Sequence, residues 1–125
     1  MNIRLFNPSD YELLCSWWKE HNWPSIPFEF LPKIGIIVDD CVAGFIYSTD
    51  SKICWLEFII SDPKSENYKR QVALNILIEE ACKTSSALGF KAIFTSVSHK
   101  RLIQKYQNNG FEITDNNMTN LMRII

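Results

Sequence analysis

The sequence has no long hydrophobic run. Its apolar stretches are short and interrupted, far from the roughly 20 residues that a membrane-spanning helix needs. Residues 1–5 read as a strand and lack the apolar core of a secretory signal. Lys and Arg total 13 against 14 Asp and Glu, interspersed, so no basic face is available to neutralise a phosphate backbone. These absences predict a cytoplasmic protein that binds neither membranes nor nucleic acid.

The pattern of metal-ligating residues is also sparse. The only two histidines, His21 and His99, lie far apart, and no two of the four cysteines form Cys-x-x-Cys. A zinc site has tighter ligand pairing than this. Each cysteine lies in an apolar stretch, which favours reduced core thiols (Cys15, Cys41, Cys54 and Cys82). We therefore expect no metal site.

Proline is infrequent except in one segment. Three of the five prolines fall within residues 22–32, among several aromatic side chains. Proline this dense forbids a long helix or an inner strand. An apolar loop is unfavourable in water, so we expect this segment to pack on the body or to close over a binding site.

The remaining pattern alternates between strand and helix signals. Residues 2–6 predict a first strand, and residues 7–10 supply polar caps and a proline for a helix start. Tyr11, Leu14 and Trp18 then recur at helical spacing. This first helix is expected to place an apolar stripe on the core.

Three strands follow with very short gaps, which predicts an antiparallel meander over residues 33–39, 41–49 and 52–60. The third strand is apolar on both faces, as expected of a strand covered on both sides. Glu57 is the one charged residue among its apolar neighbours.

The second half predicts a long helix, a buried strand, a short helix and a closing hairpin, with a glycine after each helix. In order these are residues 65–88, Gly89, 90–97, 102–108, Gly110, and a hairpin of 111–114 and 118–125. No repeat or linker interrupts the chain. The sequence therefore predicts one α+β domain over residues 1–125, with a central mixed, mostly antiparallel sheet flanked by helices.

Two local motifs lie where a predicted helix passes into the next predicted strand. Leu88-Gly89-Phe90-Lys91 joins the long helix to the next strand, and three residues separate Tyr106 from Gly110-Phe111. With these motifs, the whole chain resembles the Gcn5-related N-acetyltransferase (GNAT) family. The resemblance implies direct acetyl transfer from acetyl-coenzyme A to an amine of a small molecule or peptide, in a ternary complex. The alternative is a catalytically inactive domain of this fold that binds another protein.

One departure from the family pattern concerns the turn that binds the coenzyme pyrophosphate. Glycines there let the backbone approach the phosphates at a helix N-terminus. One register of the motif places Lys69 and Gln71 at the glycine positions, and the other places Tyr68 and Arg70 there. Either the turn still binds pyrophosphate, with Lys69 or Arg70 adding charge, or side chains fill it and the fold serves another purpose.

Two residues are candidates for the chemistry. Glu57 lies among apolar residues that should raise its pKa toward working pH, which suits a general base; otherwise it reaches solvent or pairs with an arginine. The resemblance makes Tyr106 the candidate acid for the coenzyme sulfur, and the alternative is a ring that only packs the short helix on the sheet.

The resemblance also indicates where the two substrates bind. The acyl group is expected along Phe58, Ile59, Ile60 and Ser61, whose strand carries the backbone N–H that stabilises the oxyanion. Ser98 follows the strand where relatives place an asparagine that holds the pantetheine arm. Relatives build the acceptor wall where this sequence has Trp17, Trp18, Trp23, Phe28 and Phe30. Trp17 and Trp18 are more typical of core, so the acceptor-binding residues are expected to be Trp23 and Phe28, together with Trp55.

Overall fold

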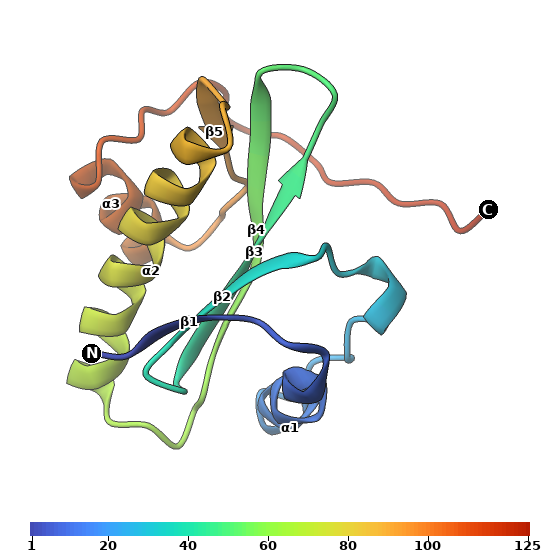
Figure 1. The fold of residues 1–125 in the computed structure, drawn as a ribbon, viewed down its shortest axis with the longest axis vertical. Coiled ribbons are helices and arrows are strands. Elements are labelled where there is room, and N and C mark those ends of the chain that lie inside the picture. Colours follow the sequence, from blue (N-terminus) through green and yellow to red (C-terminus); the bar gives the residue numbers. More distant parts are fainter.

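The computed structural model describes all residues from Met1 to Ile125 and contains one five-stranded sheet in the order β1-β2-β3-β4-β5. Helices α2 and α3 cover one face of this sheet and α1 covers the other (Figure 1). The predicted α+β class is confirmed. The strands are β1 (Ile3–Leu5), β2 (Ile34–Val38), β3 (Val42–Ser48), β4 (Ile53–Ser61) and β5 (Ala92–Phe94), and the helices are α1 (Tyr11–Glu20), α2 (Asn67–Ala87) and α3 (Lys100–Asn108).

The start of α1 is built by its polar cap. Asn7 and Asp10 form a capping box around a 3₁₀ turn, Pro8–Asp10, that leads directly into α1. Asp10 also accepts two hydrogen bonds from the Arg4 guanidinium, at 2.8 and 2.9 Å, which tie β1 to the helix start. These bonds to Arg4 hold the pKa of the Asp10 carboxyl below its usual range.

The first helix buries the face that its spacing predicted. Leu14, Trp17 and Trp18 are at most 4% exposed and pack on the sheet against Phe45 and Ile60. Trp17 and Trp18 therefore belong to the core, as predicted from the sequence.

Helix α2 lies across the other face and presents small and branched residues to the sheet, among them Ala73, Leu77 and Ala81. The helix ends at Ala87. Gly89, two residues later, has φ +93°, the left-handed conformation expected of a glycine stop. None of the helices is both long and apolar enough to cross a membrane.

A β-bulge interrupts the pairing of β3 with β4. Ala43 pairs with Ile60 and Phe45 with Glu57, so Phe58 and Ile59 together lie opposite Gly44. Phe58 adopts φ +55°. The bulge changes which face each residue takes: Leu56 and Ile59 both face the α2 side, and Ile60 faces the α1 side. Strict alternation would have put Ile59 and Leu56 on opposite faces.

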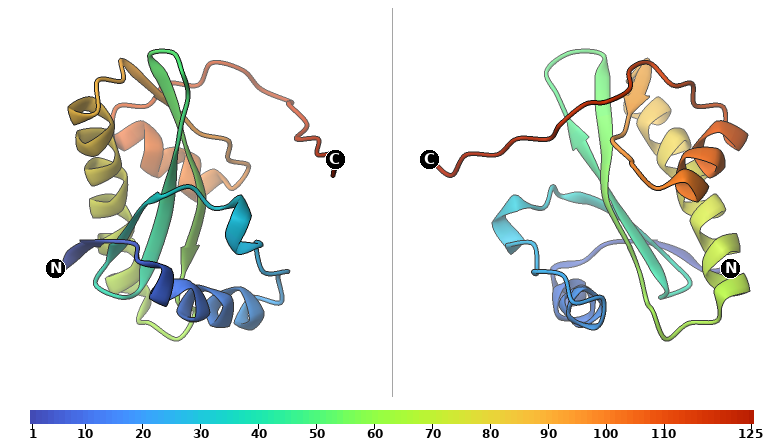
Figure 2. Two further views of the ribbon diagram at one scale, coloured as in Figure 1. Left: turned by 45° about the vertical axis from the view of Figure 1, so that its right-hand side comes forward. Right: turned by 180° about the vertical axis from the view of Figure 1, so that it is seen from behind.

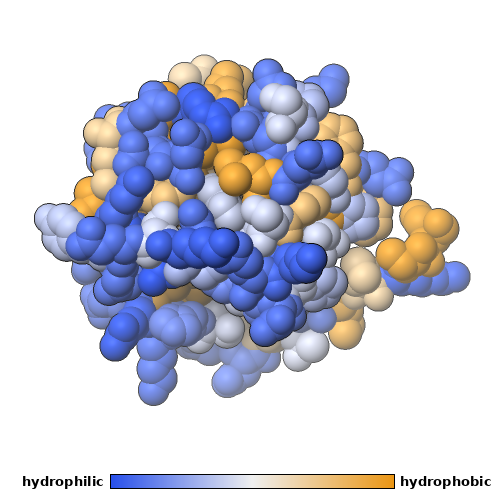
Figure 3. Space-filling model, turned by 90° about the horizontal axis from the view of Figure 1, so that it is seen from below, coloured by the Kyte–Doolittle hydropathy of each residue, from blue (hydrophilic) through white to orange (hydrophobic).

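The predicted hairpin at the C-terminus is wrong. Residues 111–125 contain no strand, and residues 112–125 make no hydrogen bond. The chain runs past the sheet as an extended segment and ends away from the body, where its apolar groups project (Figures 2 and 3). The alternation in this segment signals strand propensity, but a strand also needs a partner, and β5 pairs only with β4.

Candidate functional site

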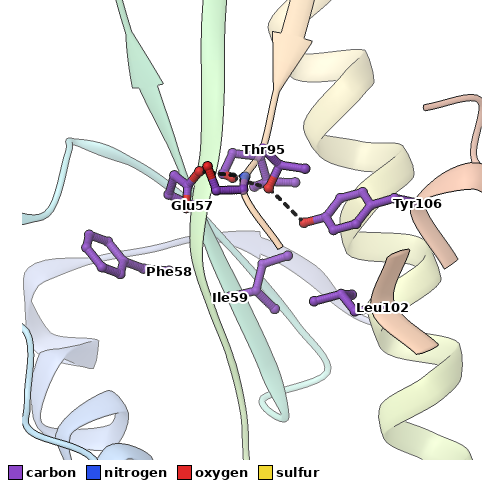
Figure 4. A pocket seen from close by; sticks show the side chains of 8 residues that line it. Glu57, Phe58, Ile59, Thr95, Leu102 and Tyr106 are labelled. Atoms are coloured by element: carbon purple, nitrogen blue, oxygen red, sulfur yellow. Dashed lines mark hydrogen bonds between the residues drawn. The ribbon is translucent and has the colours of Figure 1, made fainter. Parts of the chain in front are cut away.

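A cavity of about 200 Å³ lies where β4 and β5 separate. The two strands pair in parallel only from Ile53–Ala92 to Trp55–Phe94 and then diverge. Side chains bridge the opening: the Thr95 hydroxyl donates to the Leu56 carbonyl at 2.7 Å, and the Ser96 N–H donates to the Glu57 carboxylate at 2.9 Å. The lining residues are Leu56, Glu57, Phe58, Ile59, Thr95, Ser96, Leu102 and Tyr106 (Figure 4).

The bulge forms one wall of this cavity, and Gly44 makes room for it. A Cβ on Gly44 would lie 3.1 Å from Leu77 Cδ2 and 3.3 Å from Ile59 Cγ1. A bulge leaves one residue outside the hydrogen-bonded ladder, so backbone polar groups of β4 become available to a ligand here.

Glu57 occupies the last position of β4 before the bulge, with its side chain half-buried. Burial raises the pKa of its carboxyl, and the hydrogen bonds from Ser96 only partly oppose that rise. The carboxylate is therefore a better proton acceptor than one in water. The sequence predicted both the burial and the direction of this shift.

Tyr106 projects from α3 toward the opening, and its ring is 3% exposed. The ring packs edge-on against Phe111, with centroids 4.9 Å apart, while the hydroxyl reaches the cavity near Thr95 Oγ1 at 3.4 Å. Burial raises the pKa of the phenol to about 12, so the hydroxyl keeps its proton at neutral pH. The residue thus packs the helix and also presents a proton donor to the cavity.

A larger groove of about 990 Å³ lies on the other side of the bulge. Its body wall consists of Glu29, Phe30, Tyr47, Trp55, Glu57 and Phe58, and residues 120–125 of the C-terminal segment form the opposite wall. Glu57 and Phe58 line both spaces. Phe58 points to the side of β4 away from Leu102 and Tyr106 (Figure 4). A group held in the cavity would therefore meet a group held in the groove at this bulge.

The turn before α2 has a mixed character. The first N–H groups of a helix have no partner within it, which suits an anion. Lys69 pairs with Asp39 at 3.3 Å, and the buried Nε of Arg70 has no partner. Tyr68 and Gln71 are exposed. This turn offers backbone donors and two cationic groups but no glycine.

Other predicted residues lie outside both spaces. Ile60 is buried under α1, and Ser98 is exposed in the loop before α3. The Ser61 carbonyl contacts His21 Nε2 at 2.9 Å, and Trp23 stacks on the His21 ring with centroids 4.4 Å apart.

The proline-rich segment contributes to the groove through Phe30, and not through the two preferred candidates, Trp23 and Phe28. Phe28 packs against Tyr11, with ring centroids 5.3 Å apart, and lines neither space. Phe30, at the other end of the 3₁₀ turn Phe28–Phe30, lines the groove.

Thr95 and Leu102 in the cavity and Tyr47 in the groove were not predicted from the sequence. Tyr47 pairs with Trp55 in the β3–β4 register, so the predicted antiparallel pairing of residues 41–49 with 52–60 contained the signal for it. Thr95 was not identified as a lining residue because it was predicted to lie within a strand of residues 90–97, whereas β5 ends at Phe94.

No family profile and no curated protein matches this sequence. Solved structures do match. A probable acetyltransferase is 16% identical with a TM-score of 0.74, covering 100% of this chain and 99% of its own. Glucosamine-6-phosphate N-acetyltransferase from Arabidopsis thaliana is 12% identical with a TM-score of 0.70, covering 98% of each chain. The protein has the GNAT fold.

Another protein of the GNAT fold, the aminoglycoside N-acetyltransferase AAC(6')-Iy, was solved in complex with coenzyme A. It is 18% identical with a TM-score of 0.66, and the match covers 98% of this chain and 100% of its own. At these identities the likeness establishes the fold. The residues that perform any chemistry have to be argued from this chain's own site.

Proposed function

We propose that the protein is an N-acetyltransferase that moves an acetyl group from acetyl-coenzyme A directly to an amine. The observation that carries this proposal is the shared wall of Glu57 and Phe58, because it lets a donor in the cavity and an acceptor in the groove meet at one point. No covalent enzyme intermediate is required, and none of the lining residues of the cavity is a cysteine.

Acetyl-coenzyme A fits the residues present in two places. The opening between β4 and β5 offers the bulge backbone to the acyl-carrying end, and the first turn of α2 offers free N–H groups to the pyrophosphate. Lys69 and the partnerless Arg70 Nε would add charge there. When bound, the thioester supplies an activated acyl group.

Each chemical task has a residue. Glu57 accepts a proton from the incoming ammonium, so that the free nitrogen attacks the acyl carbon and a C–N bond forms. A backbone N–H at the bulge stabilises the charge that develops on the carbonyl oxygen. Tyr106 donates to the sulfur as the C–S bond breaks. Of the two protons that the nitrogen loses, one leaves through Glu57 to solvent, and the other replaces the proton that Tyr106 gave to the sulfur.

The turn before α2 favours a second function, the binding of another protein. The turn before α2 lacks glycine and Lys69 is already paired with Asp39, features that suit a domain of this fold that binds a protein and has lost the coenzyme. The same Lys69–Asp39 contact is partly exposed, so an incoming phosphate can compete for it at small cost.

Thermal unfolding with and without acetyl-coenzyme A separates the two functions. Ligand at 100 times its dissociation constant stabilises a protein by about 2.7 kcal/mol, which raises the melting temperature of a domain of this size by several degrees. We expect such a rise. An unchanged melting temperature at millimolar coenzyme would favour the protein-binding function.

A further inference from the structure

The groove that faces Glu57 has an aromatic wall built from three separate segments. Phe30 comes from the proline-rich segment, Tyr47 from β3, and Trp55 and Phe58 from β4. Phe30 and Phe58 are 41% and 39% exposed, so a ligand can cover them.

This wall is held in place before any ligand binds. The Tyr47 hydroxyl donates to the Phe30 carbonyl at 2.5 Å, and the Tyr47 and Phe58 rings meet edge-on with centroids 6.0 Å apart. The Trp55 ring packs on Phe94 with centroids 5.1 Å apart. These side chains are therefore already ordered, and a ligand that covers them loses little binding free energy in ordering them.

The charges in the groove have one sign on the body wall. Glu29 and Glu57 are its only charged residues, and the one cationic side chain in the groove, Arg123, lies on the C-terminal segment. Carboxylates beside aromatic faces attract an ammonium group, through direct charge and through cation–π contact. A phosphate group would find no cationic side chain on this wall.

Hydrogen-bonding groups for hydroxyls are scarce on the same wall. Besides the two carboxylates, its polar groups are the Tyr47 hydroxyl, whose proton is already donated to Phe30, and the indole N–H of Trp55. A sugar-like acceptor with many hydroxyls would leave several of them without partners on burial, which costs binding free energy.

We propose that the acceptor is a small primary amine on an aromatic or aliphatic scaffold, with its ammonium at Glu57 and its apolar body over Phe30, Tyr47 and Trp55. This substrate class rests on the proposed acetyl transfer and refines it. It differs from the aminoglycoside and the amino-sugar phosphate named for the two neighbours above, because the body wall has few neutral polar groups for the hydroxyls of either and no cationic side chain for a phosphate.

The test compares 2-phenylethylamine and hexylamine with glucosamine and kanamycin as acceptors, at fixed acetyl-coenzyme A, by release of the coenzyme thiol. We expect kcat/KM to be at least about 100-fold higher for the two apolar amines, the size that unpaired polar groups produce. Preferential acetylation of glucosamine or kanamycin would overturn the substrate class and leave acetyl transfer standing. A short peptide with a free N-terminus is assayed beside them, and a higher kcat/KM for it than for both apolar amines would overturn the substrate class too.

Two variants in one turn provide a matched control. Phe30→Ala removes a groove ring, while Phe28→Ala removes a similarly exposed ring outside the groove. We expect Phe30→Ala to raise KM for 2-phenylethylamine about 5- to 10-fold with kcat within about twofold, and Phe28→Ala to change neither. Equal effects of the two variants would overturn the placement.

Direct binding keeps the test decisive if no acetylation is detected. Saturation-transfer NMR on the full chain without coenzyme should detect 2-phenylethylamine and not glucosamine, and Phe30→Ala should weaken that signal. Absence of the signal would remove the groove as an amine site. Its presence without any coenzyme binding would retain the amine site and reject acetyl transfer.

Discussion

The two spaces that meet at Glu57 are built in opposite ways. The cavity between β4 and β5 is bounded by regular elements and bridged by hydrogen bonds from Thr95 and Ser96. The groove has a firm body wall, but its other wall is residues 120–125, which make no hydrogen bond at all. The difference indicates that the cavity is complete in the folded chain, whereas the groove depends on contacts that cost little to change.

The largest expected effect comes from the residue that both spaces share. Glu57→Gln keeps the shape and an oxygen that can accept the Ser96 N–H, but removes the base. We expect turnover to fall by about 10²- to 10⁴-fold, measured by coenzyme thiol release at saturating acceptor. Unchanged turnover would remove Glu57 from the mechanism.

The same variant makes a prediction about stability with a defined sign. The pKa of Glu57 in the folded chain lies above its ordinary 4.5, so the folded state binds this proton more tightly than the unfolded state does. Stability of the wild type relative to Glu57→Gln should therefore fall as pH rises from about 4.5 through the raised pKa, and stay lower above it. Urea unfolding of both proteins at pH 4 and pH 7.5 measures this difference. An increase with pH would contradict the direction of the shift.

Removing the Tyr106 hydroxyl tests the cavity side alone. Tyr106→Phe retains the ring that packs on Phe111, and the Thr95 hydroxyl still has the Leu56 carbonyl. We expect turnover to drop about 10- to 100-fold with coenzyme-induced stabilisation unchanged, because the phenol acts on the departing sulfur. Full activity would show that Tyr106 is not the proton donor and only packs α3 on the sheet.

Gly44 supports the bulge through space that a side chain would fill. We expect Gly44→Ala to cost about 1–3 kcal/mol of unfolding free energy, and the remaining folded protein to lose activity as Ile59 shifts. Gly35→Ala is the matched variant: its Cβ would lie 2.7 Å from Phe6 Cβ, away from the site. It should cost more stability while its folded fraction stays active. Equal specific activity in both variants would separate the bulge from function.

Local signals in the sequence predicted most of the fold. Helix α2 and its stop at Gly89 lie within one continuous stretch, so the glycine after its last turn is enough to mark where the helix ends. The bulge could not be predicted because it depends on how two residues of β4 meet one residue of β3. The C-terminal hairpin failed for a related reason, since alternation between apolar and polar residues does not specify a partner strand. Glu57 was identifiable from its apolar neighbours, while Tyr47 required the strand register.

The smallest expected effect tests the weaker wall of the groove. A chain that ends at Thr119 loses Leu121, Met122, Ile124 and Ile125, whose side chains are between 68% and 108% exposed. Little apolar area is lost from the fold, so the unfolding free energy should change by less than about 0.5 kcal/mol.

Coenzyme binding should also stay the same in this truncated chain, because no cavity residue is removed. For 2-phenylethylamine we expect KM to rise only a few fold, about the effect of losing one wall of an open groove. Steady-state kinetics at saturating coenzyme, beside Phe30→Ala, gives the comparison directly. If truncation raises KM more than Phe30→Ala does, the C-terminal segment is the main acceptor surface and the body wall is secondary. If instead it lowers KM, residues 120–125 obstruct the groove, and the acceptor has to displace them before its ammonium reaches Glu57.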